Sequence, residues 1–439
     1  MNAFVPITIK RLAAFVYGYY QGKRGPRRSH ANLKRRQRKL FQRLKKRTLV
    51  RTKWYHSMID KPLPEFPIID KITFLQNFDA INTVNLTLEA CEQHGLDAEL
   101  QRDFSKSLGQ VSVGLSSGTS GQRGIFLTTP IEQAEWAGYI IARNLPLRFR
   151  RQRVALILRS NNTLYEASRG ILLQFRFFDL TKPWRSLATD LEQYNPDILI
   201  APATVLEQLA SSNIVIHPQK IISVAEVLEA DTRERITEKF RISVDEIYQC
   251  TEGYIASSCS FGRMHLNDDI LIIEKEWLDR ESRRFVPIVT DLRRRSLPLI
   301  RFRLDDILVH DPKPCPCGSS MTVIEKVEGR CDDILWLPDY QNRWHAIFPD
   351  LIRRAMMLCS YCYDQYQIEQ WSDSWRIFVE SEQINVAQVN IYKQLKTLAE
   401  SQNRHLPRLE FHNGIHQSNT QKFRRVACKE KPPVNRETV

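Results

Sequence analysis

The stretch that decides the reading of this sequence is Gly114-Leu-Ser-Ser-Gly-Thr-Ser-Gly-Gln-Arg-Gly124. Four of the 16 glycines in the 439-residue chain fall within it, and Ser and Thr fill several of the other positions. A loop of this composition can turn backbone N–H groups and hydroxyls toward an anion such as a nucleotide phosphate. It does not match the Walker pattern, because no Gly-Lys-Ser/Thr closes it. Composition alone also leaves a flexible surface linker open.

The residues after this loop alternate between strand-like and helical stretches. Arg153–Arg159 contains Val-Ala-Leu-Ile-Leu, a pattern typical of a buried strand, and apolar runs recur at Pro196–Thr204 and Lys220–Val224. A helix is expected near Asp231–Phe240 and a strand at Glu246–Tyr248. This alternation predicts an α/β domain.

The pattern changes after Arg330. About a hundred residues follow with strand and helix signals of their own, such as Trp375–Val379 and Val386–Leu398. We therefore expect three parts: a basic, helical N-terminal segment over residues 1–60, a large domain over 61–331 and a small C-terminal domain over 332–439.

Five further motifs follow the glycine-rich loop in the chain. They are Ile222-Ser-Val-Ala225-Glu226, Ile247-Tyr248-Gln-Cys-Thr251-Glu252-Gly253, Pro298-Leu-Ile-Arg301-Phe-Arg303-Leu-Asp305-Asp306, Gly329-Arg330-Cys-Asp332-Asp333 and Gln421-Lys422-Phe-Arg-Arg425-Val. In this order the six motifs resemble those of the adenylate-forming superfamily, which includes acyl-CoA synthetases. The Cys-Pro-Cys-Gly sequence at 315–318 and the hinge sequence resemble those of phenylacetate–coenzyme A ligase-like proteins. The resemblance covers roughly residues 60–430.

The resemblance implies a fold and a reaction. The fold is α/β, with a large N-terminal adenylate-forming domain and a small C-terminal α+β domain that rotates about a hinge at Asp332. The implied reaction joins an aryl or acyl carboxylate to AMP, releases pyrophosphate, and then passes the acyl group to a thiol, most simply that of coenzyme A. A carrier-protein thiol and an amine remain alternative acceptors.

The resemblance also implies a role for each motif. The phosphates of ATP would be held by Ser116, Ser117, Gly118, Thr119, Ser120 and Gly121, and the adenosine by Ala225, Glu226, Tyr248, Thr251, Asp306 and Arg330. Glu252 would hold Mg²⁺, and Lys422 would bring a flexible point charge from the small domain to the reacting oxygens. Without the resemblance, Asp306 would be assigned an ion pair with Arg301 or Arg303, and Glu252 and Lys422 would be ordinary surface charges.

The motifs depart from the superfamily pattern at several positions. The lysine usual near the end of the phosphate loop is replaced by Gln122 and Arg123, and Arg123 could supply the charge with fixed planar geometry. Gln249, Asp305 and Gln421 stand where glycines are common. A degenerate, non-catalytic scaffold that binds a membrane or nucleic acid is therefore the alternative function.

Four residues in two clusters offer a metal site. Cys259 and His265 form one pair, and Cys315 and Cys317 form the other. Three thiols and an imidazole suit tetrahedral Zn²⁺, and a closed four-ligand set is typical of a structural site. The Cys-x-Cys spacing is tighter than usual, so four unrelated residues remain an alternative on spacing alone. Proteins of the resembled subgroup carry a structural zinc at such positions.

The positive charge of the chain is concentrated at its start. Seventeen of the 64 Lys and Arg residues precede Asp60, the first acidic residue. The remainder of the chain contains 47 Lys and Arg residues and 50 Asp and Glu residues. Residues 10–53 could form a solvated helical face, contact an anionic membrane surface with the nearby aromatic residues, or bind nucleic acid. Nucleic acid is the least favoured of these, because no nucleic-acid-binding motif is present.

Composition also bounds the compartment. Nine cysteines are too few for a disulfide scaffold, and no run of 18 apolar residues predicts a spanning helix. We therefore expect a cytoplasmic protein, peripheral to the inner face of a membrane if the basic segment contacts lipid.

Overall fold

The computed structural model describes residues 9–116, 123–145, 150–158, 173–415 and 424–432. These residues form two compact units. The first contains the described residues up to Ser116, those from Arg123 to Leu304, and those from Leu308 to Val327. The second contains 305–307 and the described residues from Glu328 onward.

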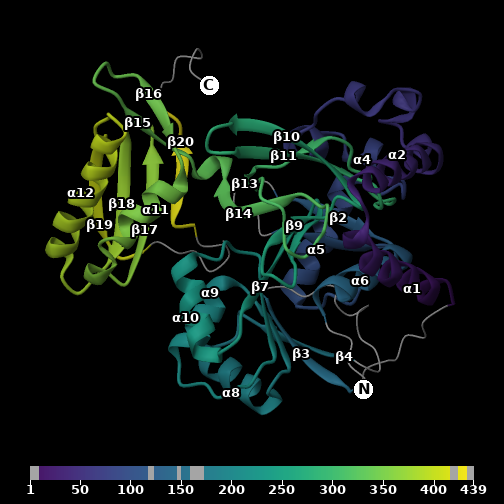
Figure 1. Ribbon diagram of the computed structural model, residues 1–439, viewed down its shortest axis with the longest axis horizontal. Helices are drawn as coiled ribbons and strands as arrows, with labels where there is room; N and C mark the ends of the chain where they lie inside the picture. Colours follow the sequence, from purple (N-terminus) through teal and green to yellow (C-terminus); the bar gives the residue numbers. More distant parts are fainter. Residues whose placement is uncertain (1–8, 117–122, 146–149, 159–172, 416–423, 433–439) are drawn as a thin grey trace. The chain divides into compact units, whose positions relative to one another are not determined.

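Along the chain, most of the described helices of the first unit either precede the strands of its main sheet or alternate with them. Figure 1 labels most of these helices. They are α1 (Ile9–Arg24), α2 (His30–Arg47), α3 (Lys71–Gln76), α4 (Phe78–Ile81), α5 (Leu88–Gln101), α6 (Pro130–Asn144), α8 (Trp184–Tyr194), α9 (Ala203–Ser211) and α10 (Ala230–Phe240). Among the residues that the structure describes, no helix has both the length and the hydropathy needed to cross a bilayer.

A twelve-stranded sheet runs through the described part of the first unit, in the order β10-β11-β13-β14-β9-β8-β7-β6-β5-β3-β4, with β12 paired to β11. Its strands are β3 (Gln152–Leu158), β4 (Leu173–Asp179), β5 (Ile198–Ala201), β6 (Lys220–Val224), β7 (Val244–Cys250), β8 (Gly253–Ser258), β9 (Met264–Leu266), β10 (Leu271–Asp279), β11 (Arg284–Asp291), β12 (Phe302–Arg303), β13 (Asp306–Asp311) and β14 (Val323–Arg330). The pairs among β3 to β7 are parallel, and β7 with β8 begins the antiparallel part.

Both faces of the central strands β3 and β5 are buried, and this burial explains why their sequences are nearly continuous apolar runs. Ala155, Ile157 and Leu199 face helices α8, α9 and α10, whose buried residues join the same cluster. Val154 and Ile198 face the opposite way, into the main core. The predicted strands at 153–159 and 220–224 and the predicted helix at 231–240 are therefore confirmed.

The basic N-terminal segment packs into this main core. Along α2 the apolar stripe of Leu40, Phe41 and Leu44 is buried, and the chain continues inward through Leu49 and Tyr55. Ser29 caps the helix by accepting a hydrogen bond from the backbone N–H of Asn32. The segment predicted to be helical over 30–53 is helical to Arg47 and continues as a short 3-10 turn.

The second unit has its own core. A four-stranded sheet in the order β19-β18-β17-β20 packs its apolar face against two helices, as its buried cluster shows. The elements are α11 (Pro349–Met357), α12 (Ile384–Ser401), β17 (Gln365–Trp371), β18 (Ser374–Glu380), β19 (Arg408–Asn413) and β20 (Val426–Glu430), with the separate pair β15 (Leu335–Pro338) and β16 (Trp344–Ile347). The strand predicted at 375–379 and the helix predicted at 386–398 are confirmed within this α+β unit.

Candidate active site and metal centre

A β-hairpin presents the glycine-rich loop. Strands β1 (Ser112–Leu115) and β2 (Ile125–Thr128) pair antiparallel, so Leu115 and Ile125 lie side by side at the two ends of the motif. The two ends of the loop are tied together: the N–H of Ser116 donates to the carbonyl of Gly124 at 2.8 Å, and the N–H of Gly124 donates to Ser116 Oγ at 2.6 Å. The described ends of the motif, Ser116 and Gly124, are therefore held next to each other.

The end of this loop lies against the Thr-Glu turn. A Cβ added to Gly124 would come within 2.7 Å of Thr251 Oγ1, so only glycine allows this close approach. Thr251 and Glu252 form the turn between β7 and β8. Two of the sequence motifs, about 130 residues apart, thus meet in the first unit.

Two cationic side chains join them. Lys71, Gly124, Thr251, Glu252 and Arg294 share the walls of one small crevice. The Arg294 guanidinium donates a hydrogen bond to the carbonyl of Thr251 at 2.7 Å, and this bond holds the Thr251–Glu252 turn in place. The sequence analysis did not find Lys71 or Arg294, because each precedes or follows the recognised motifs and carries no local signal of its own.

The position of Arg294 is fixed by a buried carboxylate. Asp291 accepts hydrogen bonds from the backbone N–H groups of Arg293 at 2.7 Å and Arg294 at 3.1 Å. Burial raises the pKa of Asp291, and the positive charge of Arg294 opposes that shift. The turn carrying Arg294 is thus built around this carboxyl group.

Arg123 is paired with a carboxylate among the described residues. Its guanidinium forms a bidentate pair with Glu99 of α5, with one N–O distance of 2.7 Å, and its Nε donates to the carbonyl of Ser116 at 2.6 Å. Its charge is already neutralised by a carboxylate. The suggestion that Arg123 replaces the missing loop lysine is therefore not supported by its contacts.

The motif Ile222–Glu226 ends at the carboxyl ends of parallel strands. Ala225 and Glu226 follow β6, and β6 pairs with β7, which carries Tyr248. Ligands of open α/β sheets bind at such ends. Glu226 accepts hydrogen bonds from the N–H and hydroxyl of Thr204 at 3.0 and 2.8 Å, so it caps α9. Ala225 has a φ of 66°, a left-handed backbone conformation that residues other than glycine rarely adopt.

Gln249, one of the glycine replacements, occupies an irregular position. The register of β7 against β8 shifts between Tyr248 and Gln249. A bulge re-aims the side chains around it, and this one directly precedes the Thr-Glu turn.

In the second unit, residues of three of the sequence motifs form an ion-pair network. Arg330 donates to Asp305 at 3.2 Å, and Asp333 accepts from the backbone N–H of Arg330 at 2.9 Å. Arg424 donates to Asp333 through its Nε, also at 2.9 Å. Asp305, which replaces a common glycine, is thus the carboxylate partner of Arg330. Asp306 begins β13, and Asp332 lies in the 3-10 turn Cys331–Asp333.

Several predicted site residues lie outside the described residues. These are Ser117, Gly118, Thr119, Ser120, Gly121 and Lys422.

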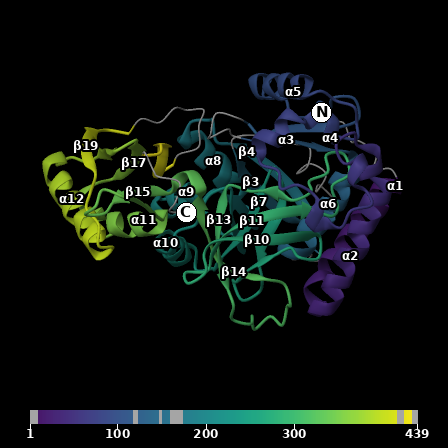
Figure 2. The same cartoon turned by 90° about the horizontal axis from the view of Figure 1, so that it is seen from above.

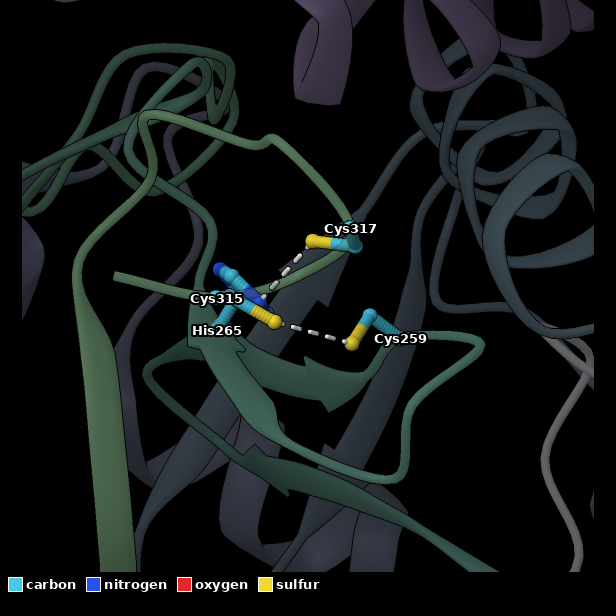
Figure 3. A group of neighbouring side chains, drawn as sticks. All are labelled: Cys259, His265, Cys315 and Cys317. Carbon is cyan, nitrogen blue, oxygen red and sulfur yellow. Dashed lines mark hydrogen bonds between the residues drawn. The ribbon is translucent and has the colours of Figure 1, made fainter. Parts of the chain in front are cut away.

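The four candidate zinc ligands converge in the first unit (Figure 3). Cys259 follows β8, His265 lies in β9, and Cys315 and Cys317 lie between β13 and β14. Their ligand atoms all lie within 4.8 Å of one another. Cys259 Sγ is 3.6 Å from Cys315 Sγ, and Cys317 Sγ is 3.5 Å from His265 Nε2.

The surroundings of this cluster orient it. His265 Nδ1 lies 3.2 Å from the carbonyl of Met321, which leaves Nε2 for the cluster, and burial lowers the pKa of His265 so that it stays neutral. Arg263 donates to the carbonyls of Pro314 and Lys313, so it fixes the loop that carries two of the cysteines. Three thiols and a neutral imidazole at this spacing fit a tetrahedral metal.

No family model matches this chain, and no curated protein matches it. Solved structures do. A 2-hydroxyisobutyryl-CoA ligase in the postadenylation state, in complex with an acyl-AMP (R3-HIB-AMP), is 16% identical over 99% of this chain and 94% of that one, with a TM-score of 0.63. The same ligase with 2-HIB-AMP and CoA in the thioesterification state gives 16% identity over 98% and 94%, with a TM-score of 0.54. The anthranilate CoA ligase AuaEII with anthranoyl-AMP gives 14% over 71% and 66%, with a TM-score of 0.51.

These similarities show that the chain has the adenylate-forming ligase fold: a large sheet-rich α/β part followed by a smaller α+β part. At this level of identity they show the fold alone. The subgroup resemblance to phenylacetate–coenzyme A ligases is not tested by them.

Proposed function

We propose that this chain is an ATP-dependent, AMP-forming carboxylate ligase. A carboxylate oxygen attacks the α-phosphorus of ATP, the bond to the β-phosphate oxygen breaks, and pyrophosphate leaves. A thiol then attacks the acyl carbon, AMP leaves and the thiol proton is released. The single observation that carries the proposal is the contact of Gly124 with Thr251, because it joins the phosphate-loop motif to the Thr-Glu motif within a fold shared with ligases solved as acyl-AMP complexes.

The charges at this contact support phosphate binding. Both reactants are anions, so catalysis must neutralise charge and hold the two together. Lys71 and Arg294 line the crevice beside the loop end and supply positive charge there. The hydroxyls and N–H groups of Ser116–Gly121 are proposed to hold the β- and γ-phosphates.

Glu252 is proposed as the Mg²⁺ ligand. Its carboxylate is a hard oxygen donor on the wall of that crevice, which suits this ion. When bound, Mg²⁺ would supply charge neutralisation of the phosphate oxygens. Tyr248 is proposed to lie against adenine, Asp306 to accept hydrogen bonds from the ribose hydroxyls, and Lys422 to contact the reacting oxygens after movement about Asp332.

The metal cluster is proposed to be a structural zinc site. Cys259, His265, Cys315 and Cys317 leave no open coordination position for a substrate if all four bind. The ion would supply cross-linking between the β8–β9 turn and the β13–β14 loop.

The substrate class is an aryl or acyl carboxylic acid of the kind that phenylacetate–coenzyme A ligase-like proteins activate. Coenzyme A is the proposed acceptor, and a carrier-protein thiol or an amine is the alternative. The reaction needs no membrane for its chemistry, so a cytoplasmic enzyme is proposed.

The test is pyrophosphate release from Mg²⁺-ATP with a panel of aryl, fatty and hydroxy acids. We predict release with a restricted set of acids, and loss of at least about 100-fold in Lys422→Ala, because removing a group that binds charge in the transition state has effects of this size. Lys431→Ala is the matched control, since Lys431 is exposed in the same basic tail. Thioester formation is then followed by loss of free coenzyme A thiol.

Two outcomes would oppose the proposal. No acid above background would favour the non-catalytic scaffold, and release that survives Lys422→Ala would remove that lysine from the reaction.

A further inference from the structure

Helix α1 leaves four large apolar side chains exposed, although its Phe15 and Tyr19 pack against the main core. Ile9, Leu12, Val16 and Tyr20 are 86%, 53%, 56% and 53% exposed. At ~100° per residue these positions fall on one face of the helix. A surface helix normally directs such residues to the core and polar residues to solvent, so α1 carries a second apolar strip on its solvent side.

Glycines at the contact between α1 and α6 fix the orientation of α1. Gly18 lies so close to the carbonyl of Glu135 in α6 that no Cβ fits, and Gly22 would bring a Cβ within 2.7 Å of Ala142 Cβ. From the other helix, Gly138 lies against the backbone of α1, where a Cβ would be 2.7 Å from Tyr19 N. The helices therefore pack backbone to backbone, and α1 cannot rotate to bury Leu12 or Val16.

Further contacts anchor the same segment. Arg28 reaches the carboxylate of Asp269 at 3.7 Å, and this fully buried group also pairs with Arg143 at 2.5 Å. On the other side, Arg293 donates toward Tyr17 at 3.4 Å. Thus the apolar face of α1 is presented by a rigidly attached helix.

Exposed basic residues lie on the same helix as this face, and more lie on α2. Lys10, Lys23 and Arg24 are exposed on α1, and the guanidinium of Arg24 lies over the ring of Tyr20 at 5.8 Å. Both views place α2 at the same end of the first unit as α1 (Figures 1 and 2). The exposed bases of α2 are Lys34, Arg35, Arg38, Lys39, Arg43, Lys46 and Arg47. No acidic residue precedes Asp60.

We infer that α1 and α2 dock the enzyme on an anionic lipid surface, with the outer face of α1 in the headgroup–acyl boundary. Apolar side chains flanked by Lys and Arg are the pattern of a helix that lies in that interface. A second copy of this chain is a poorer occupant, since a two-fold contact would bring the same bases together. Nucleic acid would use the bases but gain nothing from the apolar face.

The experiment is co-sedimentation of the full chain with phosphatidylcholine vesicles that contain or lack phosphatidylglycerol, without ATP. We expect binding to the anionic vesicles that weakens as salt is raised. The triple variant Leu12→Ser, Val16→Ser, Tyr20→Ser should lower the partition coefficient at least about tenfold. Its matched control is Val386→Ser, Val389→Ser, Tyr392→Ser on α12, where residues of similar exposure (47%, 69% and 48%) lie in the second unit.

A charge variant gives a second arm. Lys10→Gln, Lys23→Gln, Arg24→Gln keeps the apolar face and should lower binding to anionic vesicles alone. Because these residues are exposed, unchanged thermal unfolding checks that each variant is folded. Vesicle binding is read without substrate, so its result is independent of ligase activity.

Three outcomes would overturn the inference. The first is wild-type chain that anionic vesicles do not retain at all. The α1 and α12 triples could reduce binding equally. Alternatively, the chain could bind duplex DNA or RNA with an affinity that the α1 triple leaves unchanged, which would make the bases a nucleic-acid surface.

Discussion

Arg123 supports the described start of the glycine-rich loop through its own contacts. The guanidinium holds the carbonyl of Ser116 at one end of the loop, and Glu99 holds the guanidinium. We predict that Arg123→Gln and Glu99→Gln each raise the KM for ATP by several-fold. The double variant should be no worse than either single variant, because the two groups act as one unit.

Steady-state pyrophosphate release at varied ATP measures this coupling. Lys106→Gln, a neighbouring exposed base, is the control. If Arg123 instead bound phosphate directly, Glu99→Gln would leave the KM unchanged or lower it.

Glu132 gives a pH dependence at the residue scale. Burial alone would raise the pKa of its carboxyl, but donors from Thr129, Arg295 and Ser296 more than offset this, so the pKa is lowered. A carboxyl group whose pKa is lower in the folded state stabilises the protein at pH values above its unfolded pKa of about 4.3. This stabilisation is lost as the pH falls through the folded pKa.

We therefore predict that Glu132→Gln lowers stability by about 1–3 kcal/mol at pH 7, because an amide N–H₂ cannot accept these donors. At a pH below the folded pKa the difference from wild type should shrink. Urea unfolding at both pH values measures it, with exposed Glu382→Gln as control. A constant difference at all pH values would contradict the assignment.

At the scale of elements, the α1–α6 contact reverses the usual effect of glycine. Gly→Ala inside a helix normally stabilises by about 0.5–1 kcal/mol. At Gly18 the added methyl would meet the carbonyl of Glu135, and overpacking of this kind costs about 1–3 kcal/mol. We predict that Gly18→Ala lowers stability and increases hydrogen exchange in α1.

The control for this prediction is Ala13→Gly on the exposed side of the same helix. It should lose only the propensity difference. A Gly18→Ala variant as stable as wild type would show that the two helices can separate without loss.

The central parallel strands β3 and β5 could be predicted from sequence because burial on both faces makes them continuous apolar runs, as in Val154–Leu158. The exposed apolar strip of α1 could not be predicted from sequence. Its large residues read as a weak apolar segment, and only the partner helix shows that Gly18 and Gly22 are the packing positions. Periodicity reports which residues differ along a helix, but not which side faces the core.

Some residues of the candidate site could likewise be predicted from sequence, and others could not. The Thr-Glu turn and the four metal-binding candidates carry local signatures, so their residues could be named from sequence. Lys71 and Arg294 enter the crevice from separate elements and have no such signature. The pairing of Arg123 with Glu99 likewise depends on how α5 packs beside the hairpin.

The two separate cores lead to the last prediction. Units with their own buried clusters should unfold in separate transitions, so a single midpoint would not describe this protein. The candidate zinc ligands all belong to the first unit. Removing zinc with a chelator should therefore lower the midpoint of one transition, by about 2–4 °C for each kcal/mol lost, and leave the other in place.

Calorimetry together with metal analysis tests this prediction. Purified wild type should carry one zinc ion per chain, since the described cluster offers one set of four ligands. Cys259→Ser should lose the metal and lower the same transition as the chelator, whereas Cys428→Ser in the second unit should do neither. If the chelator shifts both transitions, or if zinc persists in Cys259→Ser, the cluster is not a zinc site confined to the first unit. A metal-free wild type whose unfolding is unaffected by added Zn²⁺ would reduce the four residues to a packed group of thiols around His265.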